Sequence, residues 1–360
     1  MSATFQELDQ AKADAFADRM LGTVNQAMLA LMISIGHRTR LFDCLAEMPP
    51  ARVEEIAEKA GLQPRYVREW LGAMVTGRIM EYDPQTRTYW LPPEHAAVLT
   101  RAAMPNNLAS MMQWVAVLGA VESEVVDKFI HGGGVHYCCY SRFHDVMADE
   151  SAQTVVAGLK DYILPLEPGL SEQLEAGIDV LDVGCGAGRA MAFLAEAFPK
   201  SRFTGYDFSE EAITMAKAEA ERRGLTNLRF EVRDVAQLNE REQYDLITAF
   251  DIVHDQADPA RVLREIHAAL RPDGLFLMQD IDASSHLEKN REHPIGPMLY
   301  TISTMHCMTV SLAQNGAGLG TVWGTELAEQ MLKEAGFPSV RIERLPHDIV
   351  NCYYLVRKQA

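Results

Sequence analysis

The 360-residue sequence has no hydrophobic run long enough to cross a bilayer and no cysteine pair in C-x-x-C spacing. A transmembrane helix needs about 20 consecutive apolar residues, so a membrane span is not predicted. Structural zinc sites and thiol-redox motifs use the C-x-x-C spacing, so we expect reduced thiols and no metal centre. The amino terminus also lacks a basic segment followed by an apolar core, which predicts a cytoplasmic protein.

Positive charge is scarce as well. The sequence has 33 Lys and Arg against 50 Asp and Glu, a formal net charge of −17. Because nucleic acids are bound mainly through Lys and Arg, a large polyanionic partner is not expected. The length exceeds that of a chain with one small core, so at least two domains are expected.

The first domain, residues 1–100, is predicted to be helical with a terminal hairpin. Residues 5–36 carry apolar side chains at helical spacing, and three shorter helical segments follow. Residues 80–91 have β-forming side chains on both sides of a turn at Asp83-Pro84. This order of elements predicts a winged helix-turn-helix.

Many winged helices bind DNA, but the charges of this one do not favour that role. Residues 38–100 contain eight Lys and Arg against nine Asp and Glu, whereas a DNA-binding module carries a basic face. Trp70 and Leu71, in the expected recognition helix, suit packing better than groove reading. With the apolar stripe of residues 5–36, this predicts a dimerisation domain and a homodimer.

From residue 178 onward, strand patterns alternate with helix patterns, which predicts an α/β domain with a parallel sheet covered on both faces. We place this domain at residues 171–360. Residues 101–170 are expected to form a helical linker that covers the active site. The insertion 282–322 is expected to cap the acceptor pocket.

A glycine-rich turn, "VLDVGCGAGRA" at residues 180–190, joins the first strand of this domain to a helix. Small residues there let the backbone approach a ligand, and the helix start supplies free N–H donors. A dinucleotide-binding fingerprint would need glycine at position 189, where Arg189 stands. The spacing is instead G-x-G-x-G, preceded by Asp182.

This spacing resembles motif I of the class I S-adenosylmethionine-dependent methyltransferases. The segments "FTGYDFS", "VRDVAQL" and "LRPDG" agree with that family in order and position, so the resemblance covers about residues 178–357. It implies a Rossmann-like seven-stranded sheet, mostly parallel with the last strand antiparallel. It also implies S-adenosyl-L-methionine as cofactor and S-adenosyl-L-homocysteine as product.

In the family, the acid that ends the second strand accepts the ribose hydroxyls, a role that falls on Asp207. The acid that ends the third strand accepts from the adenine N6 amine, which falls on Asp234. The cofactor-binding residues that the resemblance implies are Asp182, Gly184, Gly186, Gly188, Asp207, Phe208, Asp234, Val235 and Phe250.

The stretch "AFDIVHDQAD", residues 249–258, follows the fourth strand and should face the methyl donor. It resembles the His-Asp loop of plant-type small-molecule O-methyltransferases, which have an N-terminal winged-helix dimerisation domain and use the histidine as general base. His254 would take that role, since an imidazole titrates near neutral pH. Asp280 or Asp282 partly matches the orienting acids. The whole chain also resembles bacterial winged-helix methyltransferases of undefined substrate.

The acceptor pocket is expected to form from residues 138–151, which resemble the segment over the cofactor in those enzymes, and from the insertion. The insertion histidines at positions 286, 293 and 306 fit no metal-ligand spacing. The expected substrate residues are Tyr137, Tyr140, His144, His293, Tyr300, His306 and Trp323.

The sequence therefore predicts methyl transfer to a small-molecule acceptor, with oxygen favoured. Two alternatives remain open at this point. One is an S-methyltransferase for a thiol or thioether, in which His254 only positions the substrate. The other is a DNA-binding regulator that senses S-adenosylmethionine, which the near-neutral winged helix disfavours.

Overall fold

The computed structural model describes residues 8–105 and 107–359. It divides into two compact units, Met1–Ala116 and Val117–Ala360. The division falls inside the segment 101–170 that the sequence marks as a linker. Within the described residues, no helix combines the length and the apolar character that crossing a bilayer requires.

The first unit has the order of a winged helix-turn-helix. Its elements are α1 (Gln10–Arg38), α2 (Leu41–Ala46), α3 (Val53–Ala60), α4 (Pro64–Thr76), β1 (Glu81–Asp83), β2 (Thr88–Trp90), α5 (Pro93–Leu99), η1 (Arg101–Ala103) and α6 (Leu108–Met111).

Local signals explain the helix boundaries of this unit. The Asp9 carboxylate accepts the backbone N–H of Lys12 and caps α1, whereas Gly61, in a left-handed conformation, ends α3. Trp70 and Leu71 of α4 are buried, as expected, and the Trp70 indole donates to the Met32 carbonyl at 2.8 Å. The expected recognition helix thus uses its largest side chain for packing.

The second unit begins with the helical segment that precedes the sheet. The boundary between the units falls inside α7 (Gln113–Gly119). The segment then continues with α8 (Glu122–His131), η2 (Tyr137–Cys139), α9 (Phe143–Ser151), η3 (Ala152–Val156), η4 (Leu159–Ile163), η5 (Leu164–Leu166) and α10 (Leu170–Ala176).

A seven-stranded sheet forms the centre of the second unit, in the order β5-β4-β3-β6-β7-β9-β8. All neighbouring strands are parallel except β9, which is antiparallel to both β7 and β8, so the predicted topology is confirmed. The strands are β3 (Asp179–Val183), β4 (Arg202–Asp207), β5 (Leu228–Val232), β6 (Tyr244–Phe250), β7 (Leu270–Ile281), β8 (Arg341–Glu343) and β9 (Asn351–Arg357).

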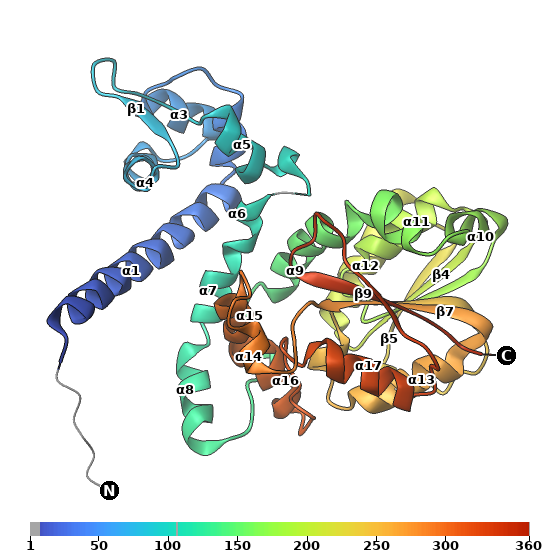
Figure 1. The fold of residues 1–360 in the computed structure, drawn as a ribbon. Helices are drawn as coiled ribbons and strands as arrows, with labels where there is room; N and C mark the ends of the chain where they lie inside the picture. The colour runs from blue at the N-terminus through green and yellow to red at the C-terminus, as the bar shows by residue number, and fades with distance from the viewer. Residues whose placement is uncertain (1–7, 106, 360) are drawn as a thin grey trace, which may run out of the picture. The chain divides into compact units, whose positions relative to one another are not determined.

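Helices cover both faces of this sheet (Figure 1). One hydrophobic core includes α10, α11 (Arg189–Ala197) and α12 (Glu210–Arg223), and the other includes α13 (Pro259–Ala269) and α17 (Gly324–Glu334). Two short turns follow strand ends: η6 (Val235–Gln237) follows β5, and η7 (Val253–Asp255) follows β6.

Two segments have local structure that the sequence analysis did not describe. The "LRPDG" segment lies at the start of β7, where the pairing with β6 shifts register and Asp273 has a positive φ of 61°. The insertion 282–322 is largely helical, with α14 (Leu287–Asn290), α15 (Gly296–Ile302), the π-helical η8 (Ser303–Cys307) and α16 (Met308–Ala313).

Candidate active site

The glycine-rich turn after β3 has a backbone that only glycine adopts without strain. Gly184, Gly186 and Gly188 have φ of 71°, 51° and 70°. A Cβ on Gly184 would lie 2.7 Å from Ile252 Cγ2, and one on Gly188 would lie 2.4 Å from the Phe230 ring. A Cβ on Gly186 would meet nothing within 4 Å. The middle glycine therefore leaves open space at which a ligand can approach the backbone.

Asp207, the last residue of β4, lies against this turn. Its carboxylate accepts the backbone N–H of Gly186 and that of Ser209, each at 2.9 Å. Burial raises the pKa of Asp207, although both hydrogen bonds oppose that shift. The next residue, Phe208, is exposed, and its ring meets the Tyr137 ring edge-on at 5.4 Å.

Asp182 and Asp234 occupy the ends of the neighbouring strands. Asp182 is buried in β3 and accepts the Thr248 hydroxyl at 2.6 Å; burial raises the pKa of Asp182 to about 7. Asp234 is exposed, and its two oxygens accept the Ala236 N–H and the Gln237 amide. A carboxylate oxygen has two lone pairs, so Asp234 retains capacity for another donor. Val235 is buried beside it.

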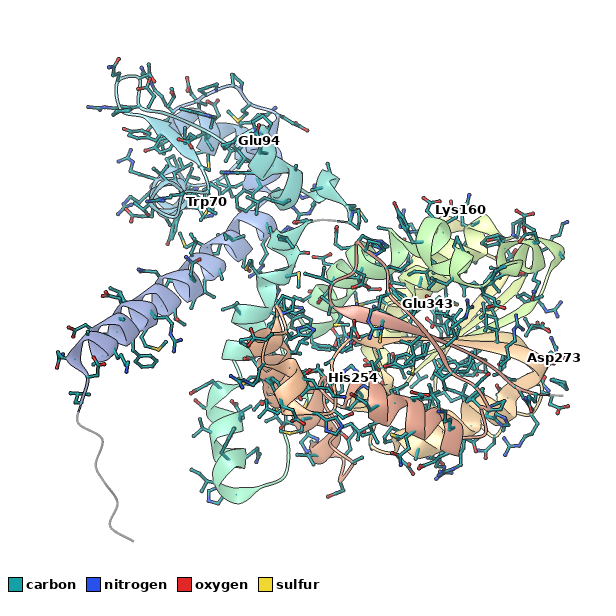
Figure 2. All side chains as sticks on the ribbon, viewed as in Figure 1. Trp70, Glu94, Lys160, His254, Asp273 and Glu343 are labelled. Carbon is teal, nitrogen blue, oxygen red and sulfur yellow. The ribbon has the colours of Figure 1, made fainter. Side chains whose placement is uncertain are left out.

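His254 lies in η7, directly after β6, and is buried at 2 % exposure. Its Nδ1 lies 2.9 Å from Asp280 Oδ1 and 3.8 Å from Asp251 Oδ1. The same Asp280 oxygen accepts the Ile281 N–H at 2.8 Å and the Trp323 indole at 3.0 Å. Figure 2 shows His254 beside the helices of the insertion. Asp280 is thus fixed by three donors.

This contact determines the tautomer of His254. An ionised carboxylate only accepts hydrogen bonds, so Nδ1 must carry the hydrogen that points at Asp280. Nε2 is then the nitrogen that can accept a proton. The Cys307 thiol, which lies 3.5 Å from His306 Nδ1, is near enough to the His254 imidazole to influence its pKa.

The charges around His254 shift its titration. Burial works against the imidazolium, but the Asp280 carboxylate and the Cys307 contact outweigh it and raise the pKa of His254 well above its ordinary value. Burial raises the pKa of Asp251 to about 8, against the opposing influence of His254. Asp251 also has a positive φ of 59°, an uncommon conformation for a residue with a side chain.

Four rings form a cluster centred on His306, near His254. The His306 imidazole stacks on the Phe143 ring at 4.2 Å and 10°, and Tyr137 and Tyr140 meet it edge-on at 5.1 and 4.8 Å. The Tyr137 hydroxyl donates to Asp255 at 2.6 Å. Burial lowers the pKa of His306 to about 3, so this imidazole is neutral at physiological pH. We call these four residues the aromatic cluster.

The structure distributes the other predicted substrate residues over three places. His144 lies 3.1 Å from the Ser209 hydroxyl, next to Asp207, and Trp323 binds Asp280. His293 contacts the Asp282 carbonyl, and Tyr300 accepts from Asn290, so these two belong to the insertion's own hydrogen-bond network. Among the cofactor residues, Phe250 is half-buried at the end of β6.

The structure also brings together three possible metal ligands that the spacing of the histidines in the sequence did not indicate. Ligand atoms of Asp251, His254 and Asp280 lie within 4.8 Å of one another, the arrangement among the described residues that could hold a cation. Asp251 Oδ1 and Asp280 Oδ2 are buried without a hydrogen-bond partner among those residues. The three residues come from the ends of two neighbouring strands, β6 and β7.

Two protein families match different parts of the chain. Residues 27–101 match the Rv2258c-like winged HTH domain, and residues 174–336 match a methyltransferase domain. The structure of human N-acetylserotonin methyltransferase in complex with S-adenosylmethionine superposes with a TM-score of 0.69 at 18% identity and covers 100% of both chains. At that identity, the likeness shows the fold alone.

Two curated relatives match over shorter stretches. The ubiquinone biosynthesis O-methyltransferase of Coxiella burnetii is 34% identical over 109 residues, 29% of this chain and 44% of that protein. The malonyl-[acyl-carrier protein] O-methyltransferase of Bacillus cereus is 33% identical over 157 residues, 44% of this chain and 52% of that protein. The chain thus spans about half the length of the curated relatives it matches.

The two family models match separate parts of this chain. The chain combines an N-terminal winged helix-turn-helix domain with a methyltransferase domain, as its sequence motifs predicted.

Proposed function

We propose that this protein transfers the methyl group of S-adenosylmethionine to a hydroxyl of a small-molecule acceptor, with His254 as general base. The observation that carries this proposal is the 2.9 Å contact between His254 Nδ1 and Asp280 at the carboxyl edge of the sheet. The glycine-rich turn lies at the same edge, where open α/β sheets bind their ligands.

The donor would bind between the glycine-rich turn and the ends of β4 and β5. Asp207 would accept both ribose hydroxyls, while Asp234 and the Val235 N–H would bind the adenine edge. Gly186 offers the open approach to the backbone. Asp182, Gly184, Gly188, Phe208 and Phe250 complete the proposed cofactor site.

The chemical step is an in-line displacement. The acceptor oxygen bonds to the methyl carbon as the carbon–sulfur bond breaks, and the sulfonium becomes the neutral thioether of S-adenosylhomocysteine. His254 Nε2 takes the hydroxyl proton, and the Asp280 carboxylate stabilises the resulting imidazolium. Positioning of the two reactants supplies much of the remaining rate enhancement.

The aromatic cluster is the proposed wall of the acceptor pocket. Its rings are held by hydrogen bonds from Tyr137 to Asp255 and from Tyr140 to the Met305 carbonyl, both at 2.6 Å. A neutral His306 adds no charge to this wall. His144, His293, Tyr300 and Trp323 are the further candidate contacts for the acceptor.

The test is a screen of hydroxyl, thiol and amine compounds for production of S-adenosylhomocysteine. We expect a hydroxyl compound as the acceptor, and activity that persists in the presence of a chelator, because Asp280 already orients His254 through hydrogen bonds. A thioether acceptor with a pH-independent rate would contradict the proposal, since its sulfur has no proton to lose. Loss of activity on chelation would instead assign a cation to Asp251, His254 and Asp280.

A further inference from the structure

Two exposed cysteines lie next to each other in the turn η2. Of the six cysteines, all of which the structure describes, Cys138 and Cys139 are exposed, and the other four are half-buried or buried. Because Cys138 and Cys139 are consecutive residues of one short turn, both thiols leave the backbone at neighbouring Cα atoms. Burial and the Cys138 thiol both raise the pKa of Cys139. The surface of the described chain therefore presents two neighbouring thiols.

The backbone that carries this pair is held at both ends. Before it, the Val135 N–H donates to the Thr309 hydroxyl, and a Cβ on Gly134 would lie 1.9 Å from the Thr309 carbonyl. After it, the Tyr140 hydroxyl donates to the Met305 carbonyl at 2.6 Å. The turn thus presents both thiols from a fixed scaffold, which reduces the entropy lost when one ligand takes both.

The spacing of the pair disfavours a disulfide as its bridged form. Neighbouring Cα atoms are about 3.8 Å apart across a trans peptide, whereas disulfides usually join Cα atoms about 4.4–6.8 Å apart. A bridging atom between the two sulfurs lengthens the ring and relieves that mismatch. Soft, thiophilic centres prefer sulfur ligands, and a monosubstituted trivalent arsenical has two valences to offer.

We propose that Cys138 and Cys139 form a dithiol site that binds monosubstituted trivalent arsenicals. With an arsenical oxide, both S–H bonds break, two As–S bonds form, and the oxide oxygen leaves as water with the two protons. Arsenic stays trivalent, so no oxidant or reductant takes part. After the first bond forms, the second is intramolecular and has a high effective concentration.

The position of the site links it to the aromatic cluster. Cys138 and Cys139 directly join Tyr137 to Tyr140, and both tyrosines contact the His306 ring. Bridging the two thiols fixes their side chains together, so the tyrosines on either side must adjust. If the proposed function holds, the bound arsenical raises the KM for the acceptor and leaves the affinity for S-adenosylmethionine unchanged.

The test uses phenylarsine oxide and mass spectrometry of the intact full-length protein. We expect one phenylarsenic group per chain that survives an excess of a monothiol and is removed by a 1,2-dithiol. Cys138→Ser and Cys139→Ser should each bind about 10²–10⁴-fold more weakly, because each keeps a single thiol at the site. Cys44→Ser is the matched control and should bind as the wild type does.

Several outcomes would overturn the site: no adduct on the wild type, an undiminished adduct on either single variant, or a wild type that has already lost two hydrogens as a disulfide. Peptide mapping of the adduct decides the same question if a variant misfolds. The mass measurement needs no methyl transfer, so failure of the proposed function leaves the arsenical result standing. If the enzyme is active with the arsenical fully bound and its KM for the acceptor is unchanged, the dithiol site stands but does not affect the acceptor pocket.

Discussion

At the scale of single residues, one carboxylate decides what the His254 imidazole can do. Asp280 is fully buried and receives three donors on one oxygen, which leaves it little freedom to turn away from Nδ1. The nearby Asp282 is instead engaged by both nitrogens of the Arg344 fork at 2.6 and 2.7 Å. The structure thereby distinguishes two acids that the sequence left equivalent.

His254→Ala should lower turnover roughly 10²–10⁴-fold and leave the affinity for S-adenosylmethionine nearly intact. Because the base acts as the neutral imidazole and its pKa is raised, the wild-type rate should rise with pH through an apparent pKa above about 6.5. A pH–rate profile of both proteins on the identified acceptor checks this. A mutant that keeps the rising limb would assign the base to another residue.

Asp280→Asn should move the same limb to lower pH. The amide keeps the shape of the side chain but removes the negative charge that raises the pKa of His254, while burial still lowers it. The plateau rate should also fall, because the imidazolium loses its counter-charge. Asp282→Asn is the control, since that acid pairs with Arg344, and its profile should match that of the wild type.

Asp207→Ala should weaken the binding of S-adenosylmethionine by one to two orders of magnitude. Hydrogen bonds to a charged group contribute about 1.5–3 kcal/mol, and the variant also frees the Gly186 N–H that Asp207 now holds. Calorimetry of donor binding measures the change. A dissociation constant equal to that of the wild type would remove Asp207 from the cofactor site.

At the scale of helices and strands, local sequence patterns predicted most of the secondary structure. The turn residues, helix caps and β-forming runs of the sequence predicted the strands of the sheet, their order along the chain and the winged helix. The "LRPDG" segment interrupts the pairing of β7 with β6, because Leu270 lies opposite Tyr244 and Leu275 lies opposite Leu246. The insertion shows no clear period, and its short helices depend on packing that no local pattern records.

The site was partly predictable, because some of its residues belong to local sequence patterns. Glycines and acids at strand ends are visible in the sequence, whereas the partner of His254 lies 26 residues further along the chain. That partner comes into reach only because β6 and β7 are neighbours in the sheet. Cys307, which influences the pKa of His254, comes from η8, an element that the sequence did not predict.

The glycine-rich turn supplies a prediction about the stability of an element. Gly188→Ala should destabilise the protein by about 1–3 kcal/mol, because the new Cβ meets the Phe230 ring at 2.4 Å and φ is 70°. Gly186→Ala shares the positive φ but meets no atom within 4 Å, so it should cost less. Urea unfolding of the two variants makes the comparison. Equal losses would show that backbone conformation alone sets the cost.

At the scale of the whole molecule, the N-terminal unit presents apolar surface that its own core does not use. The C-terminal part of α1 packs into the winged-helix core through Ile33, with Leu29 and Met32 beside it. The helix also carries large exposed hydrophobic side chains, namely Phe16, Met20, Leu21, Val24, Met28 and Ile35. Such a surface is typical of an interface between subunits.

We therefore propose that α1 mediates a homodimer, and we expect sedimentation to give twice the chain mass of 40.1 kDa at micromolar concentration. The double variant Val24→Glu and Met28→Glu should give the monomer, because it places charge in the interface. Both side chains are more than half exposed, so the fold of the chain should tolerate the change. Gln26 lies about 200° around the helix from Val24, on the other side of α1. The Gln26→Glu variant adds charge there and should remain a dimer. If the wild type sediments as a monomer, the exposed stripe of α1 serves some other partner, and the winged helix does not act as a dimerisation domain.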